Sequence, residues 1–372
     1  MRRRIELEEL DDDEEFEGDE ELEAAELELD DDDDAEGGHG FLWAAAALGA
    51  FVAVRAAMRN GRAISLRSKS VIVTGGSRGL GLVLARELVR EGARVAICAR
   101  DEEELERALA DLETLDGEAI ALECDVTDRV QVDAMVRTVR ERFGGVDVLI
   151  NNAGVIQVGP AEQMELEDYE EAMLTHFWAP LYTTMAVLPL MRARGAGRIV
   201  NISSIGGKIS LPHLLPYSAS KFALVGLSEG LRATLARERI VVTTVCPGLI
   251  RTGSPRHVTV KGRHRAEYAW FKVADSLPLL SAGAERAARQ IVDALRHGDA
   301  ELVMPGLAWL QVKLHGLFPG LAADVAALLE RALPAPAGEE GRARRSGAES
   351  ESEWSASPLT ALTDEAAGEN NE

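Results

Sequence analysis

Two side chains four residues apart, Tyr217 and Lys221, have the chemistry and the spacing of a proton-transfer pair. On a helix, positions i and i+4 share a face, so the phenol and the ammonium would enter one cleft. A phenol with a pKa of about 10 is a poor base at neutral pH, but a nearby cation favours its ionised form. The pair therefore predicts a general acid–base site, although the same spacing also occurs on solvated helix faces.

A glycine-rich segment, residues 74–81 (TGGSRGLG), follows a short β-branched run and precedes a helical pattern that begins near Leu80. Such a turn lets the backbone approach a pyrophosphate, whose charge then faces the amino terminus of the helix. The spacing is GxxxGxG, which differs from the GxGxxG fingerprint of other dinucleotide sites. Its position after the first strand of an alternating pattern predicts a site for the phosphates of a dinucleotide.

The elements that must position these groups alternate between strand and helix from Lys69 to about Val303. Such alternation implies parallel strands joined by right-handed crossovers. The predicted fold is therefore α/β, a doubly wound parallel sheet of Rossmann type, with a single catalytic domain over residues 67–303. The predicted strands are 71–74, 94–98, 119–124, 146–150, 198–202 and 240–246, and the clearest helices are 80–91, 102–115 and 129–143.

The charge of the chain is concentrated outside this domain. The 372 residues carry a net charge of −23, but residues 1–36 hold 21 acidic side chains against three arginines, and the tail from residue 335 holds nine against three. The rest is close to neutral, so no basic footprint predicts nucleic-acid binding. We expect residues 1–36 and 334–372 to be disordered, because they are too polar or too charged to form a core.

Apolar segments flank the domain at residues 37–66 and 304–333. The first contains 14 uncharged residues, from Phe41 to Val54, whereas a membrane span needs roughly 20. One interpretation is a membrane anchor with the domain on its cytoplasmic face, because arginines follow the run. The other is an Ala-rich helix that packs on its own domain or on a twin subunit of a homodimer or homotetramer. The second segment predicts a helical cap over the substrate cleft or an amphipathic surface helix.

Three cysteines, Cys98, Cys124 and Cys246, stand singly within apolar runs. They form no CxxC pair and have no histidine at the spacing of a metal ligand. We therefore predict reduced thiols in the core, no metal site and a cytoplasmic protein.

Further motifs make the chain resemble the short-chain dehydrogenase/reductase family. Besides the GxxxGxG loop, they are Asp125-Val126, residues 151–154 (NNAG), residues 247–252 (PGLIRT), and Ser204 thirteen residues before Tyr217. The resemblance implies an oxidoreductase that interconverts a carbonyl and an alcohol. It also implies that the cofactor is bound by Thr74, Gly75, Ser77, Arg78, Gly79, Leu80, Gly81, Arg100, Asp125, Val126, Asn152, Ala153, Gly154, Tyr217, Lys221, Pro247, Gly248, Ile250 and Thr252.

The same resemblance assigns the catalytic roles. Tyr217 would give its proton to the carbonyl oxygen, and Ser204 would hydrogen-bond that oxygen. Lys221 would lower the pKa of the tyrosine and hold the nicotinamide ribose. Ser203 is the neighbouring alternative, but the spacing to Tyr217 favours Ser204.

The end of the second predicted strand distinguishes the two nicotinamide cofactors. A carboxylate there would bind the ribose 2′-hydroxyl of NAD, but by resemblance the discriminating residue is Ala99. Arg100 follows it and Arg78 lies in the glycine loop, and guanidinium groups suit a 2′-phosphate. We therefore predict NADP(H) over NAD(H). Asp101, the rival NAD ligand, is expected to cap the next helix instead.

One position departs from the family pattern. His176 stands where the family has an asparagine, whose main-chain carbonyl holds a water that links the lysine to solvent. A main-chain role survives a change of side chain, so we expect activity to persist. Two roles stay open for the imidazole: a part in proton relay, or plain helix packing.

Residues 253–280 cover the substrate loop by resemblance and mix basic with aromatic side chains. Such a loop would receive a lipophilic substrate with an acidic head, or lie against an anionic membrane surface. We predict a hydrophobic carbonyl or alcohol as the small-molecule substrate. The alternatives are an NAD-dependent alcohol dehydrogenase on the same fold and a non-catalytic NADP-binding sensor or scaffold.

Overall fold

The computed structural model describes residues 37–277, 281–355 and 360–372. The acidic block 1–36, for which we predicted disorder, lies outside them. The chain divides into two compact units, Met1–Arg55 and Ala56–Glu372. The predicted catalytic domain falls within the second unit.

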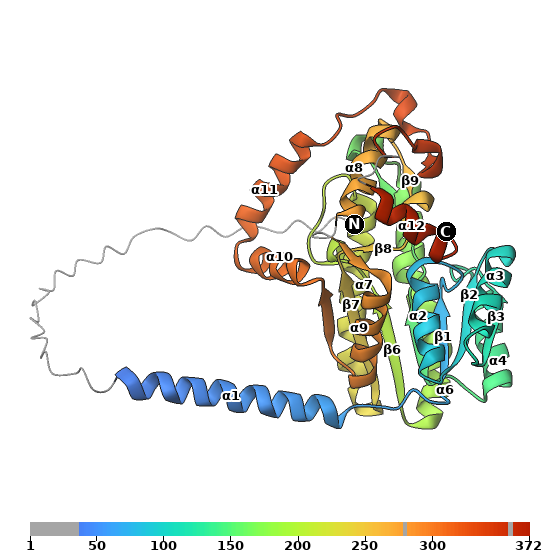
Figure 1. Cartoon of the computed structure of the whole chain (residues 1–372), viewed down its shortest axis with the longest axis vertical. Coiled ribbons are helices and arrows are strands. Elements are labelled where there is room, and N and C mark those ends of the chain that lie inside the picture. Colours follow the sequence, from blue (N-terminus) through green and yellow to red (C-terminus); the bar gives the residue numbers. More distant parts are fainter. Residues whose placement is uncertain (1–36, 278–280, 356–359) are drawn as a thin grey trace, which may run out of the picture. The chain divides into compact units, whose positions relative to one another are not determined.

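A parallel sheet forms the centre of the second unit (Figure 1). Its strands are β1 (Ser70–Thr74), β2 (Arg94–Ala99), β3 (Ala119–Glu123), β4 (Val148–Asn151), β6 (Gly197–Ile202), β7 (Ile240–Pro247) and β11 (Glu301–Met304). Within the described residues this sheet is seven-stranded, in the order β11-β7-β6-β4-β1-β2-β3, and every neighbouring pair is parallel. The predicted doubly wound α/β fold is confirmed.

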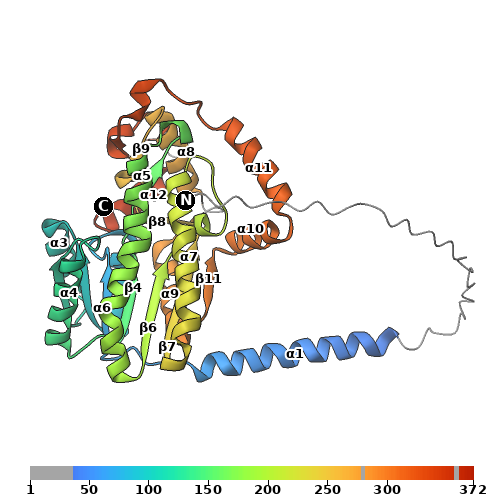
Figure 2. The same ribbon diagram turned by 180° about the vertical axis from the view of Figure 1, so that it is seen from behind.

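Helices cover both faces of the sheet (Figures 1 and 2). One face packs against α2 (Gly79–Arg90), α3 (Glu102–Glu113) and α9 (Ala284–His297). The other packs against α4 (Arg129–Phe143), α6 (Ala179–Arg194) and the end of α7 (Leu215–Leu235). A further helix, α5 (Leu166–Met173), precedes α6 along the chain.

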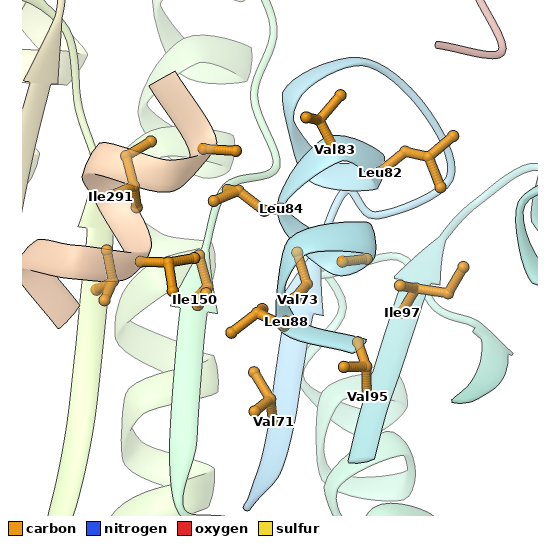
Figure 3. Close-up of a cluster of buried hydrophobic side chains, with 14 of the residues drawn as sticks. Val71, Val73, Leu82, Val83, Leu84, Leu88, Val95, Ile97, Ile150 and Ile291 are labelled. Atoms are coloured by element: carbon orange, nitrogen blue, oxygen red, sulfur yellow. The ribbon is translucent and has the colours of Figure 1, made fainter. Parts of the chain in front are cut away.

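Successive side chains of β1 belong to two different hydrophobic clusters, one on each face of the sheet. Val71 and Val73 join Leu88 of α2 and Ile291 of α9 on one face (Figure 3). Ile72 belongs to the cluster on the other face. Successive side chains of a strand face opposite sides of the sheet. Burial on both faces explains why these strands read as continuous β-branched runs instead of alternating with polar residues.

The order of the strands reverses between β1 and β4. From β1 the chain continues through β2 and β3 in one direction, then returns to β4 and continues through β6 and β7 in the other. At such a switch point the loops after neighbouring strands turn apart and leave a crevice at the carboxyl ends of the strands. The glycine-rich loop after β1 and the NNAG segment after β4 both lie there.

Shorter elements are built over the carboxyl ends of the strands. They are β5 (Gln157–Val158), β8 (Leu249–Arg251), β9 (Thr259–Val260), α8 (His264–Ser276), β10 (Ser281–Gly283), β12 (Arg345–Ser346) and α12 (Ala361–Glu369). β8 pairs with β10, and β9 lies between β5 and β12. The prediction of a disordered tail from residue 334 is therefore wrong for much of that segment, because β12 joins a sheet and α12 packs on α8.

The apolar segment after β11 forms two helices, α10 (Gly306–Leu317) and α11 (Pro319–Ala332). Large apolar side chains on the two helices and at Phe318 between them are exposed; those on the helices are Trp309, Leu310, Leu314, Leu317, Leu321, Val325, Leu328 and Leu329. In the described part of the chain, no single helix is long and apolar enough to cross a membrane. These two helices meet the length and hydropathy criteria only as a pair, bent by 119° at the break.

The uncharged run near the amino terminus lies in α1 (Gly37–Gly61). Its side chains Leu48, Phe51 and Val54 are exposed. Both interpretations from the sequence, a membrane anchor or a helix that packs on protein, stay predictions.

Leu88→Ala should lower the free energy of unfolding by about 2–5 kcal/mol, because the side chain is fully buried between α2 and the sheet and its removal leaves a cavity. Chemical denaturation with urea measures the change. Val130→Ala, at a side chain that is 76% exposed, is the control and should change stability by about 0.5 kcal/mol or less. Equal effects in the two variants would contradict the packing described here.

Candidate active site

The glycine-rich loop is held in shape by contacts behind it. The Thr74 hydroxyl accepts hydrogen bonds from the backbone N–H groups of Asn152, at 3.0 Å, and Ala153, at 3.1 Å. The Asn152 side-chain amide donates to the carbonyls of Thr74 and Gly75. A Cβ on Gly81 would lie 1.9 Å from the Gly75 carbonyl oxygen, so only glycine allows α2 to start this close to the loop.

A cavity of about 860 Å³ opens above the loop, at the switch point. Two predicted cofactor ligands, Thr74 and Gly81, do not line it: both are buried and position the loop instead of facing the cavity. The other predicted residues do line it: Gly75, Ser77, Arg78, Gly79, Leu80, Arg100, Asp125, Val126, Asn152, Ala153, Gly154, His176, Ser204, Tyr217, Lys221, Pro247, Gly248, Ile250 and Thr252.

Ser204 and Tyr217 come together at the end of β6 and the start of α7. Ser204 follows β6, and its Oγ accepts a hydrogen bond from the backbone N–H of Gly206 at 3.0 Å. The Ser203 hydroxyl instead donates to the Lys221 carbonyl at 3.0 Å, so it serves to join β6 to α7. Of the two serines, Ser204 is the one whose hydroxyl bonds with the Tyr217 phenol.

Lys221 lies one helical turn after Tyr217. Its ammonium donates to the Ile202 carbonyl at 3.0 Å and lies 5.6 Å from the centre of the tyrosine ring. Burial lowers the pKa of Lys221 to about 7.

Burial raises the pKa of Tyr217 to about 12, against the opposing effect of its hydrogen bond with Ser204. The sequence predicted a phenol whose pKa is brought down by Lys221. Burial is the larger effect on the phenol in this structure, and a lowering of its pKa by Lys221 stays a prediction. A tyrosine that keeps its proton at neutral pH is suited to donate that proton to a carbonyl oxygen.

His176 lies in a π-helical turn, Leu174–Trp178, between α5 and α6. Its Nε2 accepts a hydrogen bond from the backbone N–H of Val155 at 3.1 Å, so Nδ1 carries the proton and donates to Ser220 Oγ at 2.7 Å. The Ser220 hydroxyl donates in turn to the Tyr217 carbonyl. Burial, and after it the charge of Lys221, lowers the pKa of His176 well below its ordinary value. These bonds hold a neutral ring edge-on to Tyr217 and favour the packing role.

His176→Asn should leave the shape of the pH–rate profile unchanged, because the imidazole stays neutral across the working range. The unfolded chain takes up a proton on this residue below pH about 6.5, whereas the folded chain does not. The histidine therefore lowers stability as the pH falls, and the variant should lose less stability in acid. Steady-state rates and denaturation midpoints between pH 5 and 9 measure both effects. A shifted or missing limb in the pH–rate profile would show that the ring relays protons.

Near the end of β2, two arginines line the cavity, and one of their guanidinium nitrogens has no hydrogen-bond partner among the described residues. Among the described residues, the buried Nη1 of Arg78 has no hydrogen-bond partner. Arg100 and Ala99 line the same part of the cavity. Asp101 caps α3 as predicted, accepting from the Glu104 N–H at 2.8 Å. The donor set fits a phosphate group on the adenosine side of a dinucleotide.

Sequence reasoning missed several groups in this cavity. The Glu104 carboxylate accepts from Ser77 Oγ at 2.9 Å and lies 3.6 Å from Arg78 Nε. In the sequence, only its position in the first turn of the helix capped by Asp101 could have indicated that it lies near the cavity. His257 and Glu372 also line the cavity, and nothing in their local sequence indicated this. Cys98 and Cys124 line it as free, buried thiols.

The sequence predicts that the substrate loop, residues 253–280, presents basic side chains to a substrate or a membrane. In the structure, several of these side chains face carboxylates of the same chain instead. Lys261 is 1% exposed and lies 2.6 Å from the Asp168 carboxylate. Arg256 faces Asp364 at 3.6 Å, and His257 faces Glu372 at 3.1 Å. These three side chains therefore face carboxylates of the same chain, whereas Arg263 and Arg265 are exposed, and an acidic head on the substrate stays a prediction.

Within the described residues, no group of three or more potential ligands could hold a metal ion. The fold and the cavity at its switch point define an oxidoreductase that binds a nicotinamide cofactor.

Comparisons with known proteins identify the family. The model for short chain dehydrogenases matches residues 69–261, and the chain belongs to that family. It is 43% identical over 187 residues to a putative ketoacyl reductase of Streptomyces coelicolor, covering 50% of this chain and 72% of that one. It is 32% identical over 286 residues to dehydrogenase/reductase SDR family member 7B of Danio rerio, covering 75% of this chain and 91% of that one.

Solved structures show the same likeness. A variant actinorhodin polyketide ketoreductase with NADPH is 34% identical, with a TM-score of 0.57, covering 66% of this chain and 98% of that one. A putative short-chain alcohol dehydrogenase from Sinorhizobium meliloti has a TM-score of 0.59 and 26% identity, covering 66% of this chain and 97% of that one.

Proposed function

We propose that this chain is an NADP(H)-dependent reductase of a lipophilic ketone or aldehyde. One observation carries the proposal: Ser204, Tyr217 and Lys221 meet at a cavity that Arg78 also lines, and among the described residues the Nη1 of Arg78 has no hydrogen-bond partner. The ketoacyl reductase of Streptomyces coelicolor and the ketoreductase with NADPH support carbonyl reduction and the choice of cofactor.

When bound, the cofactor supplies hydride to the carbonyl carbon. The Tyr217 hydroxyl gives its proton to the carbonyl oxygen, so its O–H bond breaks as that of the alcohol forms. Ser204 donates a hydrogen bond to the same oxygen and fixes its position. Lys221, oriented by the Ile202 carbonyl, stabilises the phenolate by its charge until solvent returns the proton.

The lipophilic substrate is supported by the side chains at the catalytic end of the cavity. Leu211 and Leu214 lie beside the start of α7, and Trp270 and Phe271 of α8 line the same cavity. Leu307 of α10 also lines it, and exposed apolar residues continue from there along α10 and α11. We propose that this surface meets a membrane from which the substrate enters. The homodimer or homotetramer stays a prediction.

Tyr217→Phe should lower kcat for NADPH-dependent carbonyl reduction by about 10²–10⁴-fold, the usual contribution of a general acid, while the Kd for NADPH is retained. Absorbance at the NADPH band during turnover on a panel of apolar ketones and aldehydes measures the rate. Tyr182→Phe is the matched control, because that ring stacks on Trp178 outside the cavity. Retained turnover in the Tyr217 variant would remove the phenol from the mechanism, and no turnover in the unaltered chain would favour a binding protein.

Arg78→Gln should lower kcat/KM with NADPH by about 10- to 100-fold, which corresponds to the loss of charge-assisted hydrogen bonds. The same constant with NADH should change little, because NADH has no 2′-phosphate. Arg90→Gln, on the exposed end of α2, is the control. If NADH is the better cofactor of the unaltered chain, the cavity belongs to an NAD-dependent enzyme instead, and Glu104 is the carboxylate placed to bind the ribose.

A further inference from the structure

The last described segment of the chain, residues 360–372, is seated on the catalytic domain. Near its start, the Thr363 hydroxyl donates to the Asp275 carboxylate at 3.0 Å and lies 2.6 Å from the Ser276 hydroxyl, both on α8. A Cβ placed on Gly253 would come within 2.4 Å of Ala367. α12 thus packs directly on the backbone that follows the PG motif, and it leads the chain toward the glycine-rich loop.

Beyond α12 the chain takes up the polar groups of that loop. The Gly79 N–H, at the amino terminus of α2, donates to the Asn370 carbonyl at 2.9 Å. The Asn371 amide donates to the Ser77 carbonyl at 2.8 Å. Figure 1 shows the C terminus near the end of α2 that follows the glycine-rich loop. Backbone N–H groups at the amino terminus of a helix bind phosphate groups, so a phosphate of the cofactor would need this N–H.

The carboxylate of Glu372 completes the contact. Its side chain is 2% exposed, lines the cavity, and lies 3.6 Å from Arg78 and 3.1 Å from His257. Its Oε1 is 2.6 Å from the position that a Cβ on Gly79 would take. A carboxylate therefore already lies against the backbone of Gly79, in the space that a phosphate at the amino terminus of α2 would take.

The fit of this carboxylate is incomplete. Among the described residues, neither Arg78 Nη1 nor Glu372 Oε2 has a hydrogen-bond partner, although both atoms are buried. A phosphate, with three acceptor oxygens, would satisfy the guanidinium better than a carboxylate held at ion-pair distance. The segment can therefore be displaced by a ligand of that chemistry.

We propose that residues 361–372 form an intrasteric plug, which occupies the phosphate site of the cofactor and must leave before NADP(H) binds. The inference rests on the proposed NADP(H) dependence. A site that is competent for only a fraction of the time binds its ligand more weakly by that fraction. A plug in place about nine-tenths of the time would weaken the apparent affinity roughly tenfold.

Two substitutions in the 372-residue chain test the plug and leave the rest of the cavity unchanged. Ala367→Leu overfills the contact with Gly253 and should lift α12 from its seat with no change of charge. Glu372→Gln removes the carboxylate that faces Arg78. Both should bind NADPH roughly 3- to 10-fold more tightly in a fluorescence titration. Glu365→Gln, on the exposed side of α12, removes the same charge away from the loop and should bind NADPH as the unaltered chain does.

A second measurement uses the unaltered protein. Glutamyl endopeptidase should cleave after Glu369 several-fold faster when NADP⁺ is present, because the ligand releases the segment. Unchanged NADPH affinity in both variants together with unchanged cleavage would overturn the plug while leaving NADP(H) dependence intact. Weaker NADPH binding by Glu372→Gln and Ala367→Leu would overturn it too, by making the segment part of the cofactor site. A chain that binds no NADPH in any variant would refute the plug and the proposed function together.

Discussion

The site depends on one hydroxyl at the switch point of the sheet. Thr74 ends β1, and its Oγ1 accepts the first two N–H groups after β4. The two loops that border the crevice are thereby held at one spacing, with Asn152 returning two bonds to the loop after β1. The contacts around the cavity depend on this spacing of the two loops. The helix that starts at Gly79 can approach the cavity only where the glycine-rich turn is held open.

The sheet could be predicted from the sequence because it obeys local rules. Strands buried on both faces read as β-branched runs, and α4 begins and ends at the predicted residues, Arg129 and Phe143. The ordered tail could not be predicted this way. Its composition is typical of disorder, yet it is held by pairs distant in sequence, such as Lys272 with Asp364 and Arg86 with Asn370. Such pairs leave no periodic signal.

The catalytic set shows the same division. The spacing of Ser204, Tyr217 and Lys221 brings them to one cavity because β6 and α7 are regular elements. The ionisation of the phenol does not follow from its lysine neighbour alone, since burial depends on everything that surrounds the ring. Likewise, Lys261 reads as a surface charge in the sequence, but the fold buries it against Asp168. Residue types indicate the chemistry, whereas their environment sets the protonation state.

Helix α12 contacts both ends of the cavity, through Thr363 on α8 and through the residues after it on the glycine-rich loop. Phe271 and Asp275 of α8 line the catalytic end of the same cavity. Displacement of α12 by a ligand at the loop would therefore withdraw a support from the wall that receives the substrate. Linkage makes such coupling reciprocal. A nucleotide at the loop and a carbonyl compound against α8 should accordingly each change the affinity of the site for the other by the same factor.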